Sequence, residues 1–283
     1  MMPGMYPEQD VTMLSIQTNI ASLTAQQNLN TNNTFMNQTI TQLTSGYRIN
    51  SSSDDAAGLV VANQYRSSVA ELTQGVHNAN DGVSQLQIVD GGLSNISTIL
   101  DRLKTLATES ASDTFTGSRT TLDSEYQDMV GEINRQADNI GLGTTDKSMA
   151  ASLNVYIGGS TPGVTVDLSK GQVDATTLLG SASSAVDTAA HAITAIGQVD
   201  AAVSALGVVQ GTVGSSENKL TFATNLANSQ ITSYSSAEGQ IRDADMAAEA
   251  ANLTKGQVLQ QASLAAMAQA NAEPQAILSL LKG

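Results

Sequence analysis

The chain of 283 residues carries 12 Lys and Arg against 26 Asp and Glu, which gives a formal net charge of −14. Such an acidic chain is unsuited to nucleic acid, because binding needs a basic face that neutralises phosphates. Cysteine is absent and His77 lies far from His191 in the sequence, so disulfides and the usual zinc sites are not expected. No apolar run reaches the roughly 18 residues that cross a bilayer, so we expect no membrane span.

The first expected element is a polar helix over residues 13–50. It is rich in Asn, Gln, Thr and Ser but keeps apolar residues at helical spacing. Nothing else in the chain is an obvious cover for them, so we predict that this segment packs against other subunits and becomes ordered on association. The apolar positions are Ile16, Ile20, Leu23, Leu29, Met36, Ile40 and Leu43.

A long helix is predicted next, within residues 51–143. From Ala57 to Ala107 apolar residues recur in alternating steps of three and four, which is typical of a coiled-coil seam. The Ser-Ser-Ser-Asp-Asp stretch at 51–55 offers capping side chains at its start. Glycines inside the helix each cost about 1 kcal/mol relative to alanine, so the helix needs partners along its length. The seam includes Leu72, Ala79, Leu86, Leu93, Ile96, Leu100, Leu103 and Ala107, and the glycines are Gly75, Gly82, Gly91 and Gly92.

Two further helical segments are predicted to pack along this one. A stripe of Leu122, Met129 and Ile133 continues to about Ile140, where glycines follow. A returning helix is expected within residues 183–242, although several of its seam positions are polar. The apolar residues that predict its seam are Ile193, Ile196, Val203, Leu206, Val213, Leu220, Ala227, Ile231, Tyr234 and Ile241.

Residues 144–182 form a small insert between these helices. The segments 154–157 and 164–168 are rich in apolar and β-branched residues, and they flank the Gly-Gly-Ser-Thr-Pro-Gly stretch at 158–163. This arrangement predicts a β-hairpin. The paired glycines are not followed by Gly-Lys-Ser or Gly-Lys-Thr, so a turn is favoured over a phosphate-binding loop.

The last expected element is an Ala- and Gln-rich helix over residues 243–283. It also carries apolar side chains that lack an obvious partner: Val258, Leu259, Leu264, Ile277, Leu278, Leu280 and Leu281. The predicted fold is therefore mainly α. The N- and C-terminal regions form a long antiparallel, coiled-coil-like bundle, and a small β-hairpin insert lies in the middle of the chain.

Both ends of the sequence resemble bacterial flagellin. In the N-terminal part the resemblance rests on Ile-Gln-Thr-Asn-Ile-Ala-Ser-Leu at 16–23 and on three later blocks, at 43–51, 54–58 and 78–84. In the C-terminal part it rests on Ala-Glu-Gly-Gln-Ile-Arg-Asp-Ala-Asp at 237–245 and on blocks at 257–262, 268–271 and 274–281. These blocks occur in the family's order at both ends, over roughly residues 13–140 and 200–283.

The resemblance implies a structural subunit of the extracellular flagellar filament. Residues 13–50 and 243–283 then build the filament core, residues 51–143 and 183–242 form the helical rod, and residues 144–182 are the variable insert. The family is exported unfolded through the flagellar type III apparatus and polymerises through its terminal helices into the propeller used for motility. The implied partners are other copies of the chain, an export chaperone and the export apparatus, the filament cap and the hook-associated proteins.

The alternatives to a filament subunit are a junction protein and an enzyme. A hook–filament junction protein of the same superfamily has similar ends but does not build long filaments. An enzyme is disfavoured, because we find no catalytic constellation, no cofactor motif and no His-Glu-x-x-His zinc motif. We therefore expect no catalytic, metal or cofactor-binding residues.

The start of the chain departs from the family pattern. Flagellins normally begin close to the block at 16–23, whereas twelve residues precede Met13 here. We therefore expect Met13 to be the first residue of the exported protein, with residues 1–12 as an extension.

The resemblance also implies an innate-receptor contact, because flagellins are ligands of Toll-like receptor 5. The family's Leu-x-Arg-x-x-x-Leu stretch is matched at 100–106, and an acidic residue of the following helix aligns with Asp128. The candidate contact residues are thus Arg102, Leu106 and Asp128. Arg102 and Leu106 are four residues apart and share one helix face. In the alternative interpretation Arg102 is a solvated charge and Leu106 is a seam residue.

Overall fold

The computed structural model describes residues 18–143, 153–159, 163–168, 171–180 and 185–282, and of Glu273 and residues 276–282 only the backbone. The chain divides into two compact units. The first comprises the residues up to Gln64 together with Ala237 and all that follow, and the second comprises Tyr65–Ser236. The predicted extension at 1–12 and Ile16 lie outside the described residues.

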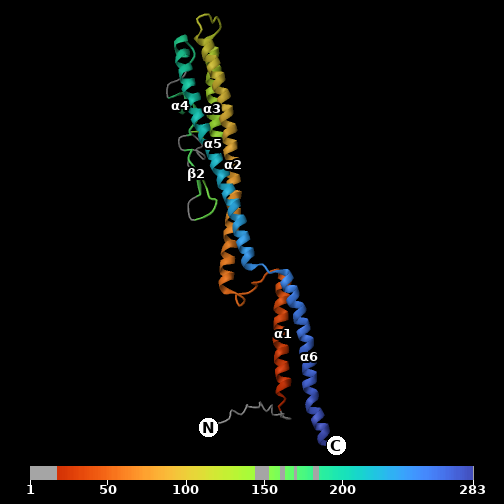
Figure 1. Ribbon diagram of the computed structural model, residues 1–283. Coiled ribbons are helices and arrows are strands. Elements are labelled where there is room, and N and C mark those ends of the chain that lie inside the picture. The colour runs from red at the N-terminus through yellow and green to blue at the C-terminus, as the bar shows by residue number, and fades with distance from the viewer. Residues whose placement is uncertain (1–17, 144–152, 160–162, 169–170, 181–184, 283) are drawn as a thin grey trace, which may run out of the picture. The chain divides into compact units, whose positions relative to one another are not determined.

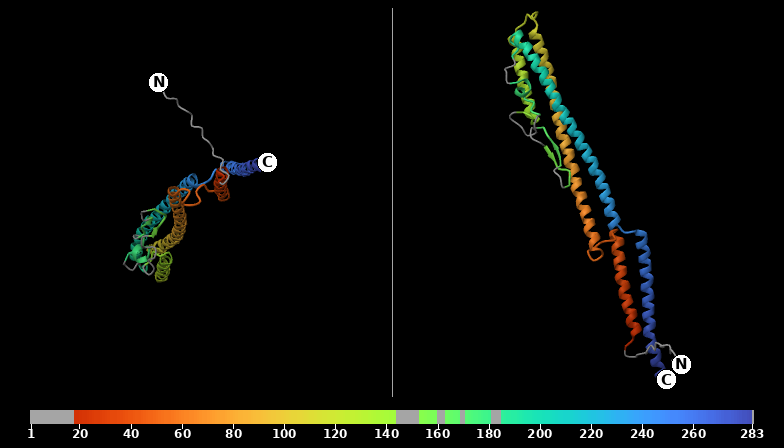
Figure 2. Two further views of the ribbon diagram at one scale, coloured as in Figure 1. Left: turned by 90° about the horizontal axis from the view of Figure 1, so that it is seen from below. Right: turned by 60° about the vertical axis from the view of Figure 1, so that its left-hand side comes forward.

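The first unit is built on two antiparallel helices, α1 (Ile20–Ser45) and α6 (Met246–Lys282), which lie side by side (Figures 1 and 2). The side chain of Asn19 caps α1 by accepting a hydrogen bond from the backbone N–H of Ser22 at 3.0 Å. Gly46 ends α1 in the left-handed conformation with φ 75°, which glycine adopts without strain. The terminal helices predicted from spacing alone are thus present.

The second unit is a bundle of long helices. Helices α2 (Ala56–Ala111) and α5 (Ala189–Arg242) enter it from the first unit, and α3 (Arg119–Asn139) packs with them (Figure 1). The core is a continuous apolar seam, and the seam predicted for α2 is confirmed by burial. Its fully buried positions include Leu86, Leu93, Ile96, Leu100 and Leu103 on α2 and Tyr126 and Ile133 on α3.

The seam predicted for α5 is wrong at Ile193 and Val203. Ile193 is 63% exposed and Val203 is exposed too, whereas the preceding Ala192 and Ala202 are buried. At these two points the buried position therefore lies one residue earlier than predicted. Side chains as small as alanine let helix backbones approach closely, so the larger isoleucine and valine are left outside. Of the later predicted seam residues, those that are buried are Leu206, Val213, Leu220 and Ala227.

A two-stranded antiparallel sheet confirms the predicted hairpin. Strand β1 (Leu153–Val155) pairs with β2 (Val164–Val166), with Leu153 opposite Val166. Sequence reasoning missed the short helix α4 (Ala175–Leu179), which packs on α3 and is capped by Asp174. Five residues are too few to show a helical period.

Two glycines of α2 make room for the hairpin. A Cβ at Gly75 would lie 1.7 Å from the carbonyl oxygen of Ile157, and one at Gly82 would lie 2.9 Å from Val155 Cγ2. The backbone of the hairpin thus rests directly on the helix. The helix stability that these glycines cost is offset by the burial of Val155 and Ile157.

A polar contact holds the same hairpin at its turn. Tyr156 Oη donates a hydrogen bond to Glu71 Oε1 at 2.6 Å, and the backbone N–H of Gly159 donates to the same oxygen at 3.0 Å. Asn78 Nδ2 donates to the carbonyl of Tyr156 at 3.0 Å. The bond from Tyr156, and then the bond from Gly159, hold the pKa of Glu71 below its ordinary value.

One helix corrects the expectation that no segment is apolar enough to span a membrane. Among the described residues, α5 alone contains an 18-residue window of mean hydropathy 1.6. The helix meets this criterion by its length and composition only. The buried face of α5 belongs to the core of the bundle, with Leu206, Val213 and Leu220 fully buried.

We predict that Gly75→Ala destabilises the second unit by about 1–3 kcal/mol, because the added methyl group collides with the backbone of Ile157. Gly91→Ala in the same helix is the matched control, since a Cβ there meets nothing within 4 Å. It should stabilise by up to about 1 kcal/mol. Denaturant unfolding of the two variants measures both, and equal effects would contradict the proposed docking.

We also predict that docking of the hairpin weakens in acid. The pKa of Glu71 is lowered in the folded protein, so its contribution is present above the ordinary value and is lost as pH falls through the lowered value. Amide exchange at Gly159, followed by NMR against pH, should accelerate in that range. Glu71→Gln keeps an acceptor oxygen without the charge, so this variant should lose the pH dependence. An identical pH profile in the variant would rule out Glu71 as the titrating group.

Candidate functional site

Large apolar side chains on α1 and α6 point away from the pair that the two helices form. Ile20 is 64% exposed and Leu23 is 61% exposed on α1, and Val258 is 60% exposed on α6. Monomeric proteins seldom expose this much apolar surface in one region without an interaction partner. We call the exposed isoleucine, leucine and valine residues of the two helices the outer face. It comprises Ile20, Leu23, Ile40, Val258, Leu259 and Leu264. Met246, the first residue of α6, is exposed as well.

The seam between α1 and α6 contains several polar contacts. Asn19 Nδ2 donates to the carbonyl of Ala270 at 2.7 Å, and Asn32 Nδ2 donates to Ser263 Oγ at 3.0 Å. Further along, Gln260 Nε2 donates to Asn33 Oδ1 at 3.0 Å.

The most buried positions of the seam are small. The described residues of the two helices that are buried are Ala25, Thr39, Gly256 and Ala270. Phe35 and Met36 lie against Gly256 but are only half-buried. Among the described residues, pairing of the two helices therefore leaves every large apolar side chain at least partly exposed.

The predicted packing residues divide accordingly. Six of them form the outer face, and Leu29, Met36 and Leu43 are half-buried. The side chains of Ile277, Leu278, Leu280 and Leu281 lie outside the described part of the chain. The described outer-face residues have the arrangement expected of side chains that pack against another molecule, although their role in assembly stays a prediction.

The three candidate receptor residues do not form one exposed group. Leu106 is 0% exposed and belongs to the core, as the seam interpretation expects. Arg102 Nε donates to Glu125 Oε1 at 3.0 Å, so its partner on α3 is Glu125 and not the aligned Asp128. Asp128 is exposed. Spacing placed Arg102 and Leu106 on one side of α2, but only the packing of α3 decides which of them is covered.

Of the acidic pair at 54–55, Asp55 caps α2 as predicted, whereas Asp54 binds backbone groups of the turn before the helix. Asp55 Oδ1 accepts the backbone N–H of Gly58 at 2.8 Å in the first turn of α2. Asp54 Oδ2 accepts the backbone N–H groups of Ser51 at 2.9 Å and Asn50 at 3.0 Å. These two bonds, with that from Ser51 the stronger, hold the pKa of Asp54 below its ordinary value.

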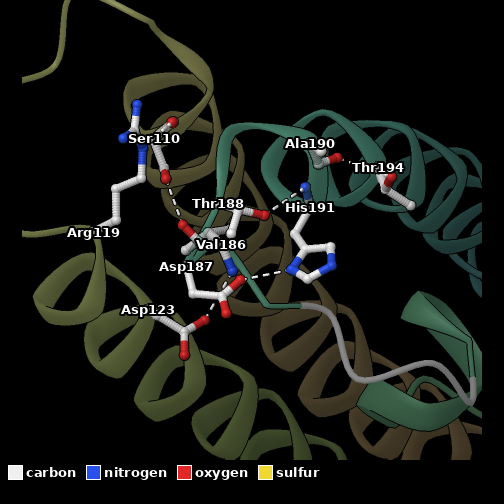
Figure 3. A network of polar contacts seen from close by, with 9 residues as sticks. All are labelled: Ser110, Arg119, Asp123, Val186, Asp187, Thr188, Ala190, His191 and Thr194. Atoms are coloured by element: carbon white, nitrogen blue, oxygen red, sulfur yellow. Dashed lines mark hydrogen bonds and ion pairs between the residues drawn. The ribbon is translucent and has the colours of Figure 1, made fainter.

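A polar network joins α2, α3 and the start of α5 (Figure 3). Asp123 Oδ1 accepts the backbone N–H of Val186 at 2.8 Å, and Ser110 Oγ donates to the carbonyl of the same residue. Arg119 Nε donates to the carbonyl of Ser110 at 3.0 Å. These bonds satisfy backbone groups where helices end, so the network has a structural role.

His191 lies at the edge of that network. Its Nδ1 lies 2.6 Å from Asp187 Oδ1, and the side chain is mostly exposed (Figure 3). Among the residues that the structure describes, no group of three or more His, Cys, Asp or Glu side chains could hold a metal ion. The pair matches an ordinary helix-surface contact between residues four apart.

The two ends of the chain match family descriptions. "Bacterial flagellin N-terminal helical region" covers residues 16–145, and "Bacterial flagellin C-terminal helical region" covers residues 196–281. The chain belongs to the bacterial flagellin family. Members of this family are structural proteins of the flagellar filament, an extracellular appendage, and they are not enzymes.

Individual relatives match this flagellin over nearly its whole length. A flagellin of Halalkalibacterium halodurans is 32% identical over 94% of this chain and 99% of its own. A flagellin of Listeria monocytogenes is 31% identical over 95% and 99%, and the flagellar filament 33 kDa core protein of Treponema phagedenis is 29% identical over 94% and 99%. A crystal structure of Bacillus cereus flagellin is 26% identical, with a TM-score of 0.47, and covers 53% of this chain and 88% of that chain.

We predict that Arg102 and Leu106 differ sharply in their effect on stability. The ion pair of Arg102 is half-exposed on both sides, so Arg102→Ala should cost less than about 1 kcal/mol. Leu106→Ala leaves a cavity in the core and should cost about 2–5 kcal/mol. Denaturant unfolding measures both. A large loss of unfolding free energy in Arg102→Ala would show that the ion pair stabilises the fold strongly. An unchanged unfolding free energy in Leu106→Ala would contradict the burial of Leu106.

Proposed function

We propose that this flagellin polymerises through the outer face of α1 and α6, which becomes buried between neighbouring subunits around the filament axis. The observation that carries the proposal is the contrast between the two surfaces of this helix pair. Hydrogen bonds and small side chains occupy the most buried positions of the inner seam, while large isoleucine, leucine and valine side chains stay exposed outside it. A helix pair arranged in this way gains most of its apolar burial from molecules other than itself.

The magnitudes agree with such an assembly. Fully burying an exposed Leu, Ile or Val side chain contributes about 1.5–3 kcal/mol. The six side chains of the outer face keep 37–64% of their surface exposed, so each can still contribute part of that amount. Association costs on the order of 4–15 kcal/mol in lost rotational and translational freedom, and ordering the segments adds to this cost. The outer face can therefore offset a part of the cost of adding one subunit, and further contacts have to supply the rest.

The finer functions follow from membership of the family. The chain is exported unfolded through the flagellar type III apparatus with its chaperone, and it adds to the filament beneath the cap, beyond the hook-associated proteins. The assembled filament is the helical propeller of motility. Recognition by Toll-like receptor 5 through Arg102 and Asp128 belongs to the same proposal, and the burial of Leu106 makes that residue a support of the surface and not a contact.

A hook–filament junction protein is the second candidate. The alignment of curated flagellins with 94–95% of this chain favours the filament subunit. Electron microscopy of purified protein after seeding separates the two functions, because a junction protein builds no long filaments.

We predict that the double variant Ile20→Ser/Leu23→Ser fails to form filaments although the second unit stays folded. The change removes two exposed apolar side chains and breaks no contact of the core. Seeded polymerisation followed by light scattering and electron microscopy measures the effect, with helicity as the test of folding.

Ile193→Ser is the matched control, because Ile193 is 63% exposed on α5, far along the chain from the terminal helices. It should polymerise with near-normal yield. Filaments of normal length from the double variant, or an equal loss in the control, would contradict an assembly surface on α1 and α6.

A further inference from the structure

An open groove of about 490 Å³ lies on the second unit between α2, α5 and the hairpin, which rests along the long helices (Figure 2). Its lining belongs entirely to that unit, so the groove does not involve the terminal helices. The lining consists largely of apolar side chains and of glycine backbone from the hairpin. The apolar side chains are Leu72, Ile157, Val164, Ala223, Leu226 and Ala227.

The floor of the groove is held in place by the core. Leu72 and Ile157 are each 8% exposed, and Ala227 is 2% exposed. Farther along α5 the ring of Tyr234, which also lines the groove, stacks on Tyr65 with their centroids 5.6 Å apart. Because these side chains are already fixed, a partner that enters the groove does not have to order them.

The polar groups of the groove favour an apolar partner over a small charged molecule. Among the described residues that line it, Glu71 carries the charge, and its Oε1 already accepts bonds from Tyr156 Oη at 2.6 Å and from the backbone N–H of Gly159 at 3.0 Å. A small-molecule site usually offers a few free polar groups that fix the orientation of the ligand. Here the carboxylate is used to dock the hairpin.

Two large apolar side chains extend this surface out of the groove. Leu226 lines the groove and is still 60% exposed, and Phe222 is 72% exposed one helical turn earlier. Residues four apart lie on the same face of a helix, so the two side chains form one rim. An exposed aromatic ring beside an apolar groove is typical of the residues that anchor a protein–protein interface.

The charges of α5 favour a second copy of the chain as that partner. Between Asp200 and Glu238 the helix carries only Glu217 and Lys219, whereas the whole chain has a net charge of −14. Two copies of such an acidic chain repel each other, and the repulsion is smallest where charges are sparse. This part of α5 therefore suits a contact between copies.

We propose that the groove and its rim, Phe222 and Leu226, form a second assembly surface that receives apolar side chains of a neighbouring copy in the filament. Subunits of an open helical filament meet through two different patches, one of which is complementary to the other. A concave apolar groove on a rigid unit is one half of such a pair. The inference goes beyond the outer face and does not depend on it, because it concerns the other unit of the chain.

The first test measures whether neighbouring copies cover this surface. The chain contains no cysteine, so Leu226→Cys or Phe222→Cys introduces a single thiol whose reaction with a maleimide reports exposure. Ile193→Cys is the matched control, because Ile193 is 63% exposed on the same helix, about 44 Å away along its axis. Reaction rates are compared between the free subunit and filaments grown from the purified chain alone.

We expect the thiols at positions 222 and 226 to react about tenfold more slowly in filaments than in the free subunit, because a neighbour excludes the reagent. The thiol at position 193 should keep nearly the same rate. Equal slowing at all three positions would overturn the proposal. Unchanged rates at 222 and 226 would also overturn it, and the groove would then belong to a partner other than this chain.

The second test removes the rim. Phe222→Ser/Leu226→Ser should leave the free energy of unfolding near that of the wild type, because both side chains are mostly exposed in the free subunit. The critical concentration for seeded polymerisation should rise about tenfold, because the apolar burial of two large side chains is lost. An unchanged critical concentration would contradict the proposed surface.

Comparison with Ile20→Ser/Leu23→Ser separates this inference from the proposed function. If the rim variant assembles normally while the outer-face variant does not, the groove is wrong and the outer face stands. If the outer-face variant assembles normally while the rim variant does not, the outer face is wrong and the groove stands.

Discussion

The apolar side chains on the outer face of α1 and α6 stay largely exposed in the described part of their own unit, and this constraint shapes how the unit can be stabilised. Asn, Ser and Gln in the inner seam supply specific hydrogen bonds, and Ala25, Gly256 and Ala270 let the helix backbones approach. Such a seam specifies which helices pair, but its large apolar side chains are only half-buried. The surface that could add most apolar burial is the outer face, which we propose packs against other subunits.

The second unit, in contrast to the first, buries its large apolar side chains in a core of its own. Its helices carry leucine and isoleucine inward along α2 and α3 and small residues inward along the first half of α5, so the bundle buries a continuous core without help. Two helix glycines contribute to this packing: the backbone of Ile157 lies against Gly75, and the side chain of Val155 lies against Gly82. The second unit therefore has an apolar core of its own, whereas we propose that the terminal helices bury their apolar side chains against other subunits.

Backbone hydrogen bonds join the segment that follows α1 to the segment that precedes α6. Within the first unit, the residues around Tyr47 and Arg242 bring together two chain segments that the sequence separates widely. Their contact concerns a single cation and a single ring, yet it lies where α1 ends and α6 is about to begin.

Particular residues show how far sequence reasoning reached. The seam of α2 was predictable because Leu86, Leu93, Leu100 and their neighbours are large and apolar, so their period is visible without knowing any partner. The seam of α5 was misplaced at Ile193 and Val203 because alanines hold the buried positions there, and alanine is common on exposed and buried faces alike. The five residues of α4 were missed because they show no period.

For the candidate site the division is similar. The sequence by itself determined the helical class, the hairpin, the cap at Asp55 and the exposed apolar residues near the ends, because each depends on local spacing or on local hydrogen bonds. Only the tertiary structure decided that Leu106 is covered, that Arg102 pairs with Glu125 and that Tyr47 meets Arg242. Those contacts depend on which distant segment packs against a given helix face, and the spacing of residues along the sequence does not indicate that segment.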